Sequence, residues 1–156
     1  MGKISMSSNI QIVPMEERHI PALAQLERIC FSQPWSESGL RSELENKLAI
    51  FCVAELNNEV LGYAGMQCVM GECYVNNIAV FPKFRDIGIG TKLVQALIDK
   101  AAQQNGVFIT LEVRKSNEQA ITMYTKLGFK QVGCRKNFYT NPLEDGLIMT
   151  KDLKEQ

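Results

Sequence analysis

The sequence predicts a mixed α/β fold in one domain, and three observations support this. The chain has 156 residues, the size of one ordinary domain and enough to bury a core without disulfides. Apolar residues follow helical spacing in some stretches and strand spacing in others, with turn residues between them. No repeat, low-complexity segment or Pro- or Ser-rich linker divides the sequence, so residues 1–156 are predicted to form a single domain.

The N-terminal part is predicted to hold one strand followed by two helices. Ile10–Val13 is the expected strand, and Glu16–Cys30 carries apolar residues at helical spacing. After a break at residues 32–35, Ser36 can cap a second short helix whose inner face carries Leu40 and Leu44.

Three strand-like runs come next and predict an antiparallel meander. They are Ile50–Leu56, Val60–Val69 and Cys73–Phe81. Turns are expected at Asn57-Asn58 and near Gly71, because Asn and Gly adopt the positive φ that tight hairpins need.

The C-terminal part alternates between helix and strand. A helix is expected to begin near Ile89 and to stop at Asn105-Gly106. The remaining predicted elements are a strand at Val107–Val113, a helix at Asn117–Leu127, and strands at Phe129–Arg135 and Gly146–Lys151. The pattern as a whole predicts a mixed α/β sheet with two halves.

Composition narrows the classes of function. Lys+Arg and Asp+Glu both number 17, so no global field would draw in nucleic acid or an anionic membrane. The five cysteines are odd in number and lack C-x-x-C spacing, which favours reduced thiols packed in the core, and no metal site is predicted. His19, the only histidine, is expected at the surface rather than as a catalyst.

The first ten residues contain no apolar signal core, and no apolar run of 18 residues follows them. A cytoplasmic protein without a membrane span is therefore expected.

The stretch FRDIGIGTKLV places two glycines where a strand gives way to a helix. Unpaired N–H groups and the dipole at a helix start favour an anion, and phosphate is the natural ligand. Gly88 and Gly90 would let the backbone approach it closely, and Arg85 could add a charge-assisted hydrogen bond. The order of residues after Gly90 does not fit a nucleoside-triphosphate loop, and Leu93 stands where a dinucleotide fingerprint needs a third glycine. Glycines that merely shape the connection are the alternative.

Several motifs, taken together, resemble one known family. They are Asn77-Ile78-Ala79-Val80, Arg85-x-x-Gly88-x-Gly90, Leu111-Glu112-Val113-Arg114, Asn117 and Ala120-x-x-x-Tyr124-x-x-x-Gly128-Phe129. In this order and spacing they resemble the GNAT superfamily of acetyl-CoA-dependent N-acetyltransferases, over roughly Ile10 to Leu153. The resemblance implies the GNAT fold, with a central mixed, mostly antiparallel sheet flanked by about four helices.

Two further segments resemble one branch of that superfamily. Pro34-Trp35-Ser36 and Arg135-x-Asn137-Phe138-Tyr139 are similar to the bacterial enzymes that acetylate the N-terminal alanine of a small-subunit ribosomal protein. The resemblance implies a protein N-terminus as acceptor, no direct contact with nucleic acid or membrane, and a monomer or weak dimer. An enzyme acting on lysine or a small amine, and a non-catalytic acyl-CoA sensor, remain alternatives.

The resemblance also implies two catalytic residues. Glu112 matches the general base, acting through water, and Tyr124 matches the general acid toward the coenzyme A sulfur. A phenol with an ordinary pKa of about 10 suits that second role. A solvated strand carboxylate and ordinary helix packing are the respective structural alternatives.

Acetyl-CoA is the implied cosubstrate. The positions that match cofactor contacts are Ile78, Ala79, Val80, Arg85, Asp86, Ile87, Gly88, Ile89, Gly90, Thr91 and Asn117. Asp86 is expected to point outward, because a carboxylate would repel phosphate, and Asn117 could equally be a helix N-cap. Phe31, Trp35 and Tyr139 match the acceptor groove, although Trp35 could equally be core.

Overall fold

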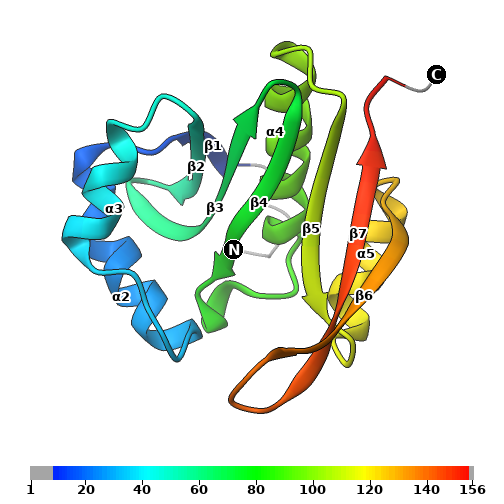
Figure 1. Ribbon diagram of the computed structural model, residues 1–156. Coiled ribbons are helices and arrows are strands. Elements are labelled where there is room, and N and C mark those ends of the chain that lie inside the picture. The colour runs from blue at the N-terminus through cyan, green and yellow to red at the C-terminus, as the bar shows by residue number, and fades with distance from the viewer. Residues whose placement is uncertain (1–8, 155–156) are drawn as a thin grey trace. The chain divides into compact units, whose positions relative to one another are not determined.

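The computed structural model describes residues 9–154 and holds a seven-stranded sheet with the strand order β1-β2-β3-β4-β5-β7-β6 (Figure 1). The N-terminal segment predicted to lack a signal lies mostly outside the described residues. The strands are β1 Gln11–Pro14, β2 Ala49–Leu56, β3 Glu59–Val69, β4 Glu72–Val80, β5 Phe108–Arg114, β6 Lys130–Tyr139 and β7 Glu144–Asp152. The helices are η1 Glu17–His19, α2 Ile20–Cys30, α3 Glu37–Leu44, η2 Pro82–Phe84, α4 Ile89–Gln103 and α5 Glu118–Lys126.

The sheet is mixed, as expected. β4 pairs with β5 in parallel, whereas the β1–β2, β2–β3, β5–β7 and β6–β7 pairs are antiparallel. None of the described helices is long and apolar enough to cross a membrane.

The chain divides into two compact units. The first comprises the chain up to Gln67 together with Asn76–Leu97, and the second comprises Cys68–Val75 together with the chain from Ile98 onward. The two ends of strand β4 therefore lie in different units, and so do the two ends of helix α4. The single domain expected from the sequence stays a prediction, and the units are described one at a time.

The first unit is built on apolar side chains of α2, α3, β2 and β3. Leu23 and Leu26 on α2 and Leu40 on α3 are fully buried in its core, as their helical spacing predicts. Ser36 caps α3, since its Oγ accepts a hydrogen bond from Gly39 N at 3.1 Å. The prediction for Leu44 was wrong: it is exposed, because α3 ends at that residue and only Leu40 reaches the core.

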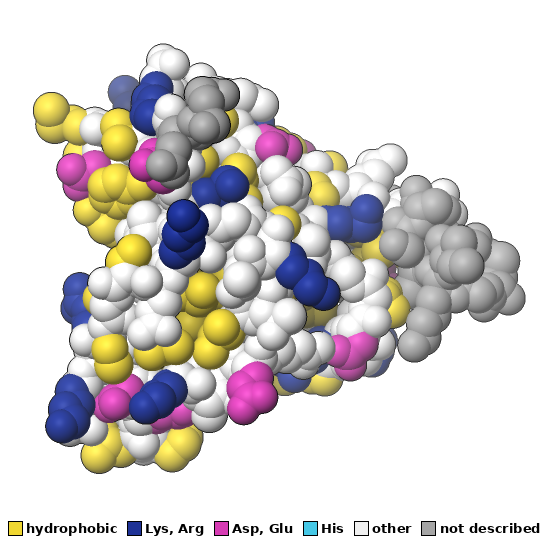
Figure 2. Space-filling view, turned by 90° about the vertical axis from the view of Figure 1, so that its right-hand side faces the viewer, with side chains coloured by type: hydrophobic (Ala, Val, Ile, Leu, Met, Phe, Trp, Pro, Cys, Tyr) yellow, Lys and Arg dark blue, Asp and Glu magenta, His cyan; other side chains and the backbone are white. Residues whose placement is uncertain are grey.

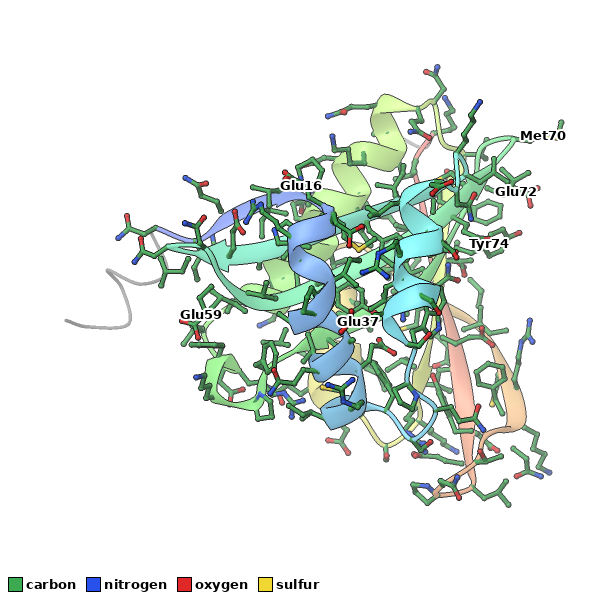
Figure 3. The ribbon with its side chains drawn as sticks, turned by 90° about the vertical axis from the view of Figure 1, so that its left-hand side faces the viewer. Glu16, Glu37, Glu59, Met70, Glu72 and Tyr74 are labelled. Atoms are coloured by element: carbon green, nitrogen blue, oxygen red, sulfur yellow. The ribbon has the colours of Figure 1, made fainter. Side chains whose placement is uncertain are left out.

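Tight turns join β2 to β3 and β3 to β4, at the places that the sequence indicates. Asn57 and Asn58 have φ of 51° and 69°, and Met70 and Gly71 have φ of 51° and 87°. Met70 is therefore a turn residue rather than a strand residue, and its side chain is 95% exposed. Figure 3 shows it directed away from the ribbon, beyond Glu72 and Tyr74, whose side chains share a hydrogen bond of 2.7 Å.

The second unit contains β5, whose residues alternate between a buried and a more exposed face. Ile109, Leu111 and Val113 are buried, so the intervening Glu112 projects to the opposite face of the strand. Asn117 caps α5 through its Oδ1, which accepts from Ala120 N at 3.1 Å, and Gly128 follows the helix with φ of 101°. The sequence predicted both ends of this helix.

Strand β6 extends four residues beyond its predicted end at Arg135. Its pairing with β7 shifts register between Gln131 and Gly133 and again between Arg135 and Tyr139. Such irregularities break the alternation of side chains that marks a strand in sequence, so the predicted strand ended before the observed one.

His19 is buried, so the expectation that it lies at the surface was wrong. Its Nδ1 accepts a hydrogen bond from Glu16 N at 2.9 Å, and its Nε2 therefore donates to Glu55 Oε2 at 3.0 Å. Arg18 donates to both oxygens of Glu55, at 2.9 and 3.0 Å. The imidazole thus serves as a hydrogen-bond partner of a buried carboxylate of the first unit.

We expect Glu55 to make stability depend on pH in the acidic range. Hydrogen bonds from Arg18 lower the pKa of Glu55 below its ordinary value of 4.5, with a further contribution from His19. A carboxyl group with a lowered folded-state pKa adds stability above the unfolded-state pKa, and that stability is lost as the pH falls through the folded-state pKa. Thermal unfolding of Glu55→Gln should show a lower Tm than wild type at pH 7 and a smaller decline below about pH 4.5. Parallel Tm curves for the two proteins would contradict this assignment.

A second buried carboxylate, that of Glu27 on α2, holds the first unit together. Its Oε1 accepts from the backbone N of Trp35 at 2.9 Å, and its Oε2 accepts from Tyr63 Oη at 2.5 Å and from Asn77 Nδ2 at 3.2 Å. Burial, followed by Glu27, raises the pKa of Tyr63 well above its usual range. Glu27 therefore links α2, β3, β4 and the segment before α3.

The cysteines only partly follow the expectation of core thiols. Cys52 and Cys73 are buried, Cys30 and Cys68 are half-buried, and Cys134 is exposed, because β6 turns that residue to solvent. Burial, followed by a hydrogen bond with Cys73, raises the pKa of the Cys68 thiol to about 12.

Candidate active site

The residues predicted to act in catalysis and binding fall into two groups, one in each unit. The first unit holds the expected cofactor loop, the end of β4 and two of the acceptor residues, namely Ile78, Ala79, Val80, Arg85, Asp86, Ile87, Gly88, Ile89, Gly90, Thr91, Phe31 and Trp35. The second unit holds Glu112, Asn117, Tyr124 and Tyr139.

The loop before α4 has the backbone geometry that the glycine pattern indicates. Gly88 has φ of +88°, and a Cβ built on it would meet no atom within 4 Å, so this face of the loop is open. The carbonyl of Gly88 accepts from Lys92 N at 3.1 Å and so begins the hydrogen bonds of α4. The preceding amides of a helix start have no intrahelical partner. An open loop and free amides fit a diphosphate such as that of coenzyme A.

Asp86 also has a positive φ, of 67°, and is exposed. Exposure agrees with the expectation that its carboxylate points outward.

Arg85 is tied to its own unit more tightly than the sequence suggested. Its Nε donates to Val80 O at 3.1 Å, and its Nη2 lies 3.4 Å from Cys30 Sγ. The guanidinium therefore fastens the loop to the ends of β4 and α2, and only its remaining N–H groups could reach a phosphate.

Replacing Gly88 by valine should weaken the binding of acetyl-CoA by about tenfold, because a β-branched residue does not adopt this φ without strain and would obstruct the open face. The loop assignment predicts the same direction for Gly90→Val. Calorimetric titration with acetyl-CoA measures the effect. Gly39→Ala is the control, since its Cβ would make only an ordinary 3.4 Å contact with Ser36 Oγ. Unchanged affinity in Gly88→Val would remove the loop from the cofactor site.

The two acceptor residues of the first unit differ in environment. Trp35 packs against the core of the unit, with its ring centroid 6.2 Å from that of Phe51. Phe31 is 38% exposed. Of the two, Phe31 is the one whose ring is available to a ligand.

Glu112 combines partial burial with an unusual partner geometry. Its Oε2 is buried, and Arg135 Nε lies 2.9 Å from it, yet among the described residues no hydrogen-bond donor is directed at this oxygen. The carboxylate thus has a charge partner that is not aligned as a hydrogen-bond donor to Oε2. A buried carboxylate oxygen in this state is suited to accept a proton from a water or an amine.

Tyr124 is buried on α5, and its ring lies 5.7 Å from that of Phe129. Burial, followed by the nearby Tyr139, raises its pKa to about 12. This is higher than the ordinary value assumed from the sequence. The phenol therefore keeps its proton throughout the physiological range and can serve as a hydrogen-bond donor.

Tyr139 is held beside these groups by residues of three strands. Gly146 on β7 makes room for it, because a Cβ there would lie 3.2 Å from the rings of both Phe138 and Tyr139. The Arg114 guanidinium lies over the Tyr139 ring at 4.5 Å. Burial, followed by Glu112, raises the pKa of Tyr139.

Arg114, the last residue of β5, and Glu144, the first residue of β7, form an ion pair at 3.2 Å. Arg114 Nη1 donates to Pro142 O at 3.0 Å, and Glu144 Oε2 accepts from Ser116 N at 2.6 Å. The segment before α5 is thereby fixed to the connection between β6 and β7.

Sequence reasoning missed the contacts of Glu27, Arg114 and Arg135. Arg114 and Arg135 appeared in the quoted motifs, but nothing in their spacing indicates a partner. Glu27 lies at a buried position of an otherwise apolar helix face, and a carboxylate at such a position is the signal that could have marked it. No group of three or more His, Cys, Asp or Glu residues between 9 and 154 could hold a metal ion.

The chain is similar to several characterised proteins. Residues 20–129 match the acetyltransferase (GNAT) family. The chain belongs to the GNAT family. It is 34% identical over 140 residues to the [ribosomal protein bS18]-alanine N-acetyltransferase of Escherichia coli strain K12, an alignment that covers 88% of this chain and 94% of that protein. The Haemophilus influenzae protein of the same name is 33% identical over 120 residues, covering 77% and 81% of the two chains.

The fold agrees with this family. The crystal structure of the ribosomal-protein-S18-alanine N-acetyltransferase from Escherichia coli matches with a TM-score of 0.84 and 31% identity, covering 94% of this chain and 96% of that one. As a GNAT protein with N-acetyltransferase relatives, the chain is an acetyl-CoA-dependent N-acetyltransferase.

Proposed function

We propose that this GNAT enzyme transfers the acetyl group of acetyl-CoA to the N-terminal α-amine of an alanine, in a small-subunit ribosomal protein. The similarity along most of the chain to enzymes named for acetylating the alanine of ribosomal protein bS18 carries the proposal. The same similarity makes bS18 the first substrate to test.

The chemistry of the acceptor supports an α-amine. At pH 7 an α-amine with a pKa of about 7.8 is roughly one-tenth neutral, whereas a lysine with a pKa of about 10.4 is well under one-thousandth neutral. The difference corresponds to about 3.5 kcal/mol that a lysine-directed site would have to supply. A single carboxylate such as Glu112 suits the easier acceptor.

In the proposed reaction the amine nitrogen bonds to the acetyl carbon and the bond from that carbon to sulfur breaks. When bound, acetyl-CoA supplies the activated acetyl group. Glu112 takes the proton of the attacking amine, directly or through one water, at its buried Oε2. Tyr124 donates a hydrogen bond from its phenol to the departing sulfur, which takes up a proton from Tyr124 or solvent and leaves as the thiol of coenzyme A.

The raised pKa of Tyr124 shapes its role. A phenol with a pKa of about 12 is a weaker acid than a typical thiol, whose pKa is about 8.5. Tyr124 therefore stabilises the sulfur mainly through its hydrogen bond, and the sulfur acquires a proton from Tyr124 or solvent as the product leaves.

Initial rates on a panel of peptides test the proposed acceptor. The panel contains the N-terminal segment of bS18 with its free alanine, the same peptide with the terminus blocked and a lysine added, and spermidine. The proposal predicts transfer to the free alanine terminus and little to the others. Transfer confined to lysine or spermidine would leave the family assignment intact and overturn the acceptor. Acetyl-CoA binding without turnover on any amine would indicate an acyl-CoA sensor.

A further inference from the structure

The Glu112–Arg135 ion pair is uneven in exposure and poorly aligned. The Arg135 side chain is 60% exposed while that of Glu112 is only 29% exposed, so the cation comes from the solvent side. Its Nε lies 2.9 Å from Glu112 Oε2 without being directed at it as a hydrogen-bond donor. The contact therefore neutralises the carboxylate but is weaker than an aligned pair.

Arg135 also contacts a second group while it lies beside Glu112. Its guanidinium carbon lies 5.5 Å from the centroid of the Phe138 ring, within the range of a cation–π contact. The pairing of β6 with β7 is irregular between Arg135 and Tyr139, and Asn137 within that stretch has φ of 55°. Asp145 Oδ1 holds the Asn137 amide at 2.8 Å, so this irregular backbone is fixed while the long arginine side chain lies at the surface.

We propose that Arg135 occupies, in the free enzyme, the place beside Glu112 that the ammonium group of the acceptor takes on binding. This inference rests on the proposed function, because about nine-tenths of an α-amine carries a proton at pH 7 and arrives as a cation. The acceptor ammonium group then replaces the Arg135 guanidinium as the positive charge beside Glu112. It can direct an N–H at Glu112 Oε2, to which Arg135 does not donate. Arg135 gives up its contact with Glu112 and keeps its contact with the Phe138 ring, and Glu112 is never buried without a cation.

Other charged groups of the second unit face the same place and remain unchanged in this exchange. They are Arg114 on β5, Glu144 on β7 and the phenol of Tyr139 on β6. Arg114 and Glu144 already neutralise each other, so Arg135 is the cation whose departure leaves Glu112 to the acceptor. Arg135 in this sense holds the place of the acceptor ammonium group in the free enzyme, and it takes no part in the bond-making step.

Arg135→Gln removes the competing charge. The KM of the alanine peptide should fall by about twofold to fivefold, the range of a partly exposed ion pair, while kcat stays within about twofold. Arg135→Lys keeps a cation and should stay near wild type. Lys136→Gln removes a charge from the next position, which is exposed, and should leave both constants unchanged.

Binding measurements separate charge competition from a change in shape. In the presence of coenzyme A, Arg135→Gln should bind the free-amine peptide more tightly than wild type does and bind the N-acetylated peptide equally well. An equal change for both peptides, a raised KM, or a loss of kcat at constant KM would overturn the proposal.

The failure of this proposal is distinguishable from that of the proposed function. If wild type acetylates a different amine, the acceptor assignment fails and the Arg135 variants are tested with that amine. If wild type acetylates the peptide and Arg135→Gln behaves as wild type, only the role of Arg135 fails. If no amine is acetylated, both fail together.

Discussion

Glu112→Gln is expected to lower kcat/KM for the alanine peptide by a factor of about 10² to 10⁴, the range that general base catalysis contributes. The amide cannot take the proton that the carboxylate accepts at its buried Oε2. The deficit should be largest at low pH, where the amine is most protonated, and should shrink above about pH 8, where the amine is already neutral. Stopped assays of peptide acetylation from pH 6 to 9 measure this trend.

Two controls test whether the loss of rate is specific to catalysis by Glu112. Glu118→Gln removes a carboxylate from the first turn of α5, outside the proposed machinery, and should retain wild-type rates. Acetyl-CoA affinity of Glu112→Gln should also be retained. A small loss of rate that does not vary with pH would mean that Glu112 is only the structural partner of Arg135.

Tyr124→Phe is expected to lower kcat by about 10² or more, with little change in the dissociation constant of acetyl-CoA. The phenyl ring keeps its packing against Phe129, so the loss is confined to the hydroxyl hydrogen that faces the departing sulfur in the proposed reaction. Pre-steady-state measurement of acetyl transfer isolates that step from product release. Tyr74→Phe is the matched control, because the hydroxyl of this exposed tyrosine contacts Glu72.

The raised pKa of Tyr124 adds a second readout. A phenol with a pKa of about 12 stays protonated, so wild-type kcat should not fall between pH 8 and 10 through ionisation of this residue. A falling limb in that range that disappears in Tyr124→Phe would contradict the burial-raised pKa. Full activity of Tyr124→Phe would remove the residue from the mechanism altogether.

Most of the fold could be predicted from local signals. Helix α5 is bounded by the N-cap Asn117 and by Gly128, which has a positive φ. Asn and Gly are the residue types that favour these two positions, so the sequence indicates both ends. The hairpin turns carry Asn57, Asn58 and Gly71 at positions of positive φ, although Met70 also has a positive φ without such a signal. Such features depend on a few neighbouring residues, and local patterns are sufficient to find them. On the face of the molecule in Figure 2, basic and acidic side chains are interspersed, in keeping with the balanced composition.

The missed side-chain contacts depend on partners far apart in the chain. The burial of His19 follows from Glu55, 36 residues away, and that of Glu27 from Tyr63 and Asn77. Glu112 on β5 meets Arg135 on β6 across the intervening strand β7, which follows both in sequence. The catalytic candidates were found by resemblance, whereas the groups that surround them required coordinates.

The measurement that tests the central claim most directly uses one peptide with both a free N-terminal alanine and an internal lysine. After incubation with the enzyme and acetyl-CoA, fragmentation in a mass spectrometer locates the acetyl group. The account predicts acetyl on the α-amine, with the lysine unmodified at partial conversion. Acetyl on the lysine side chain, with the terminus free, would contradict it.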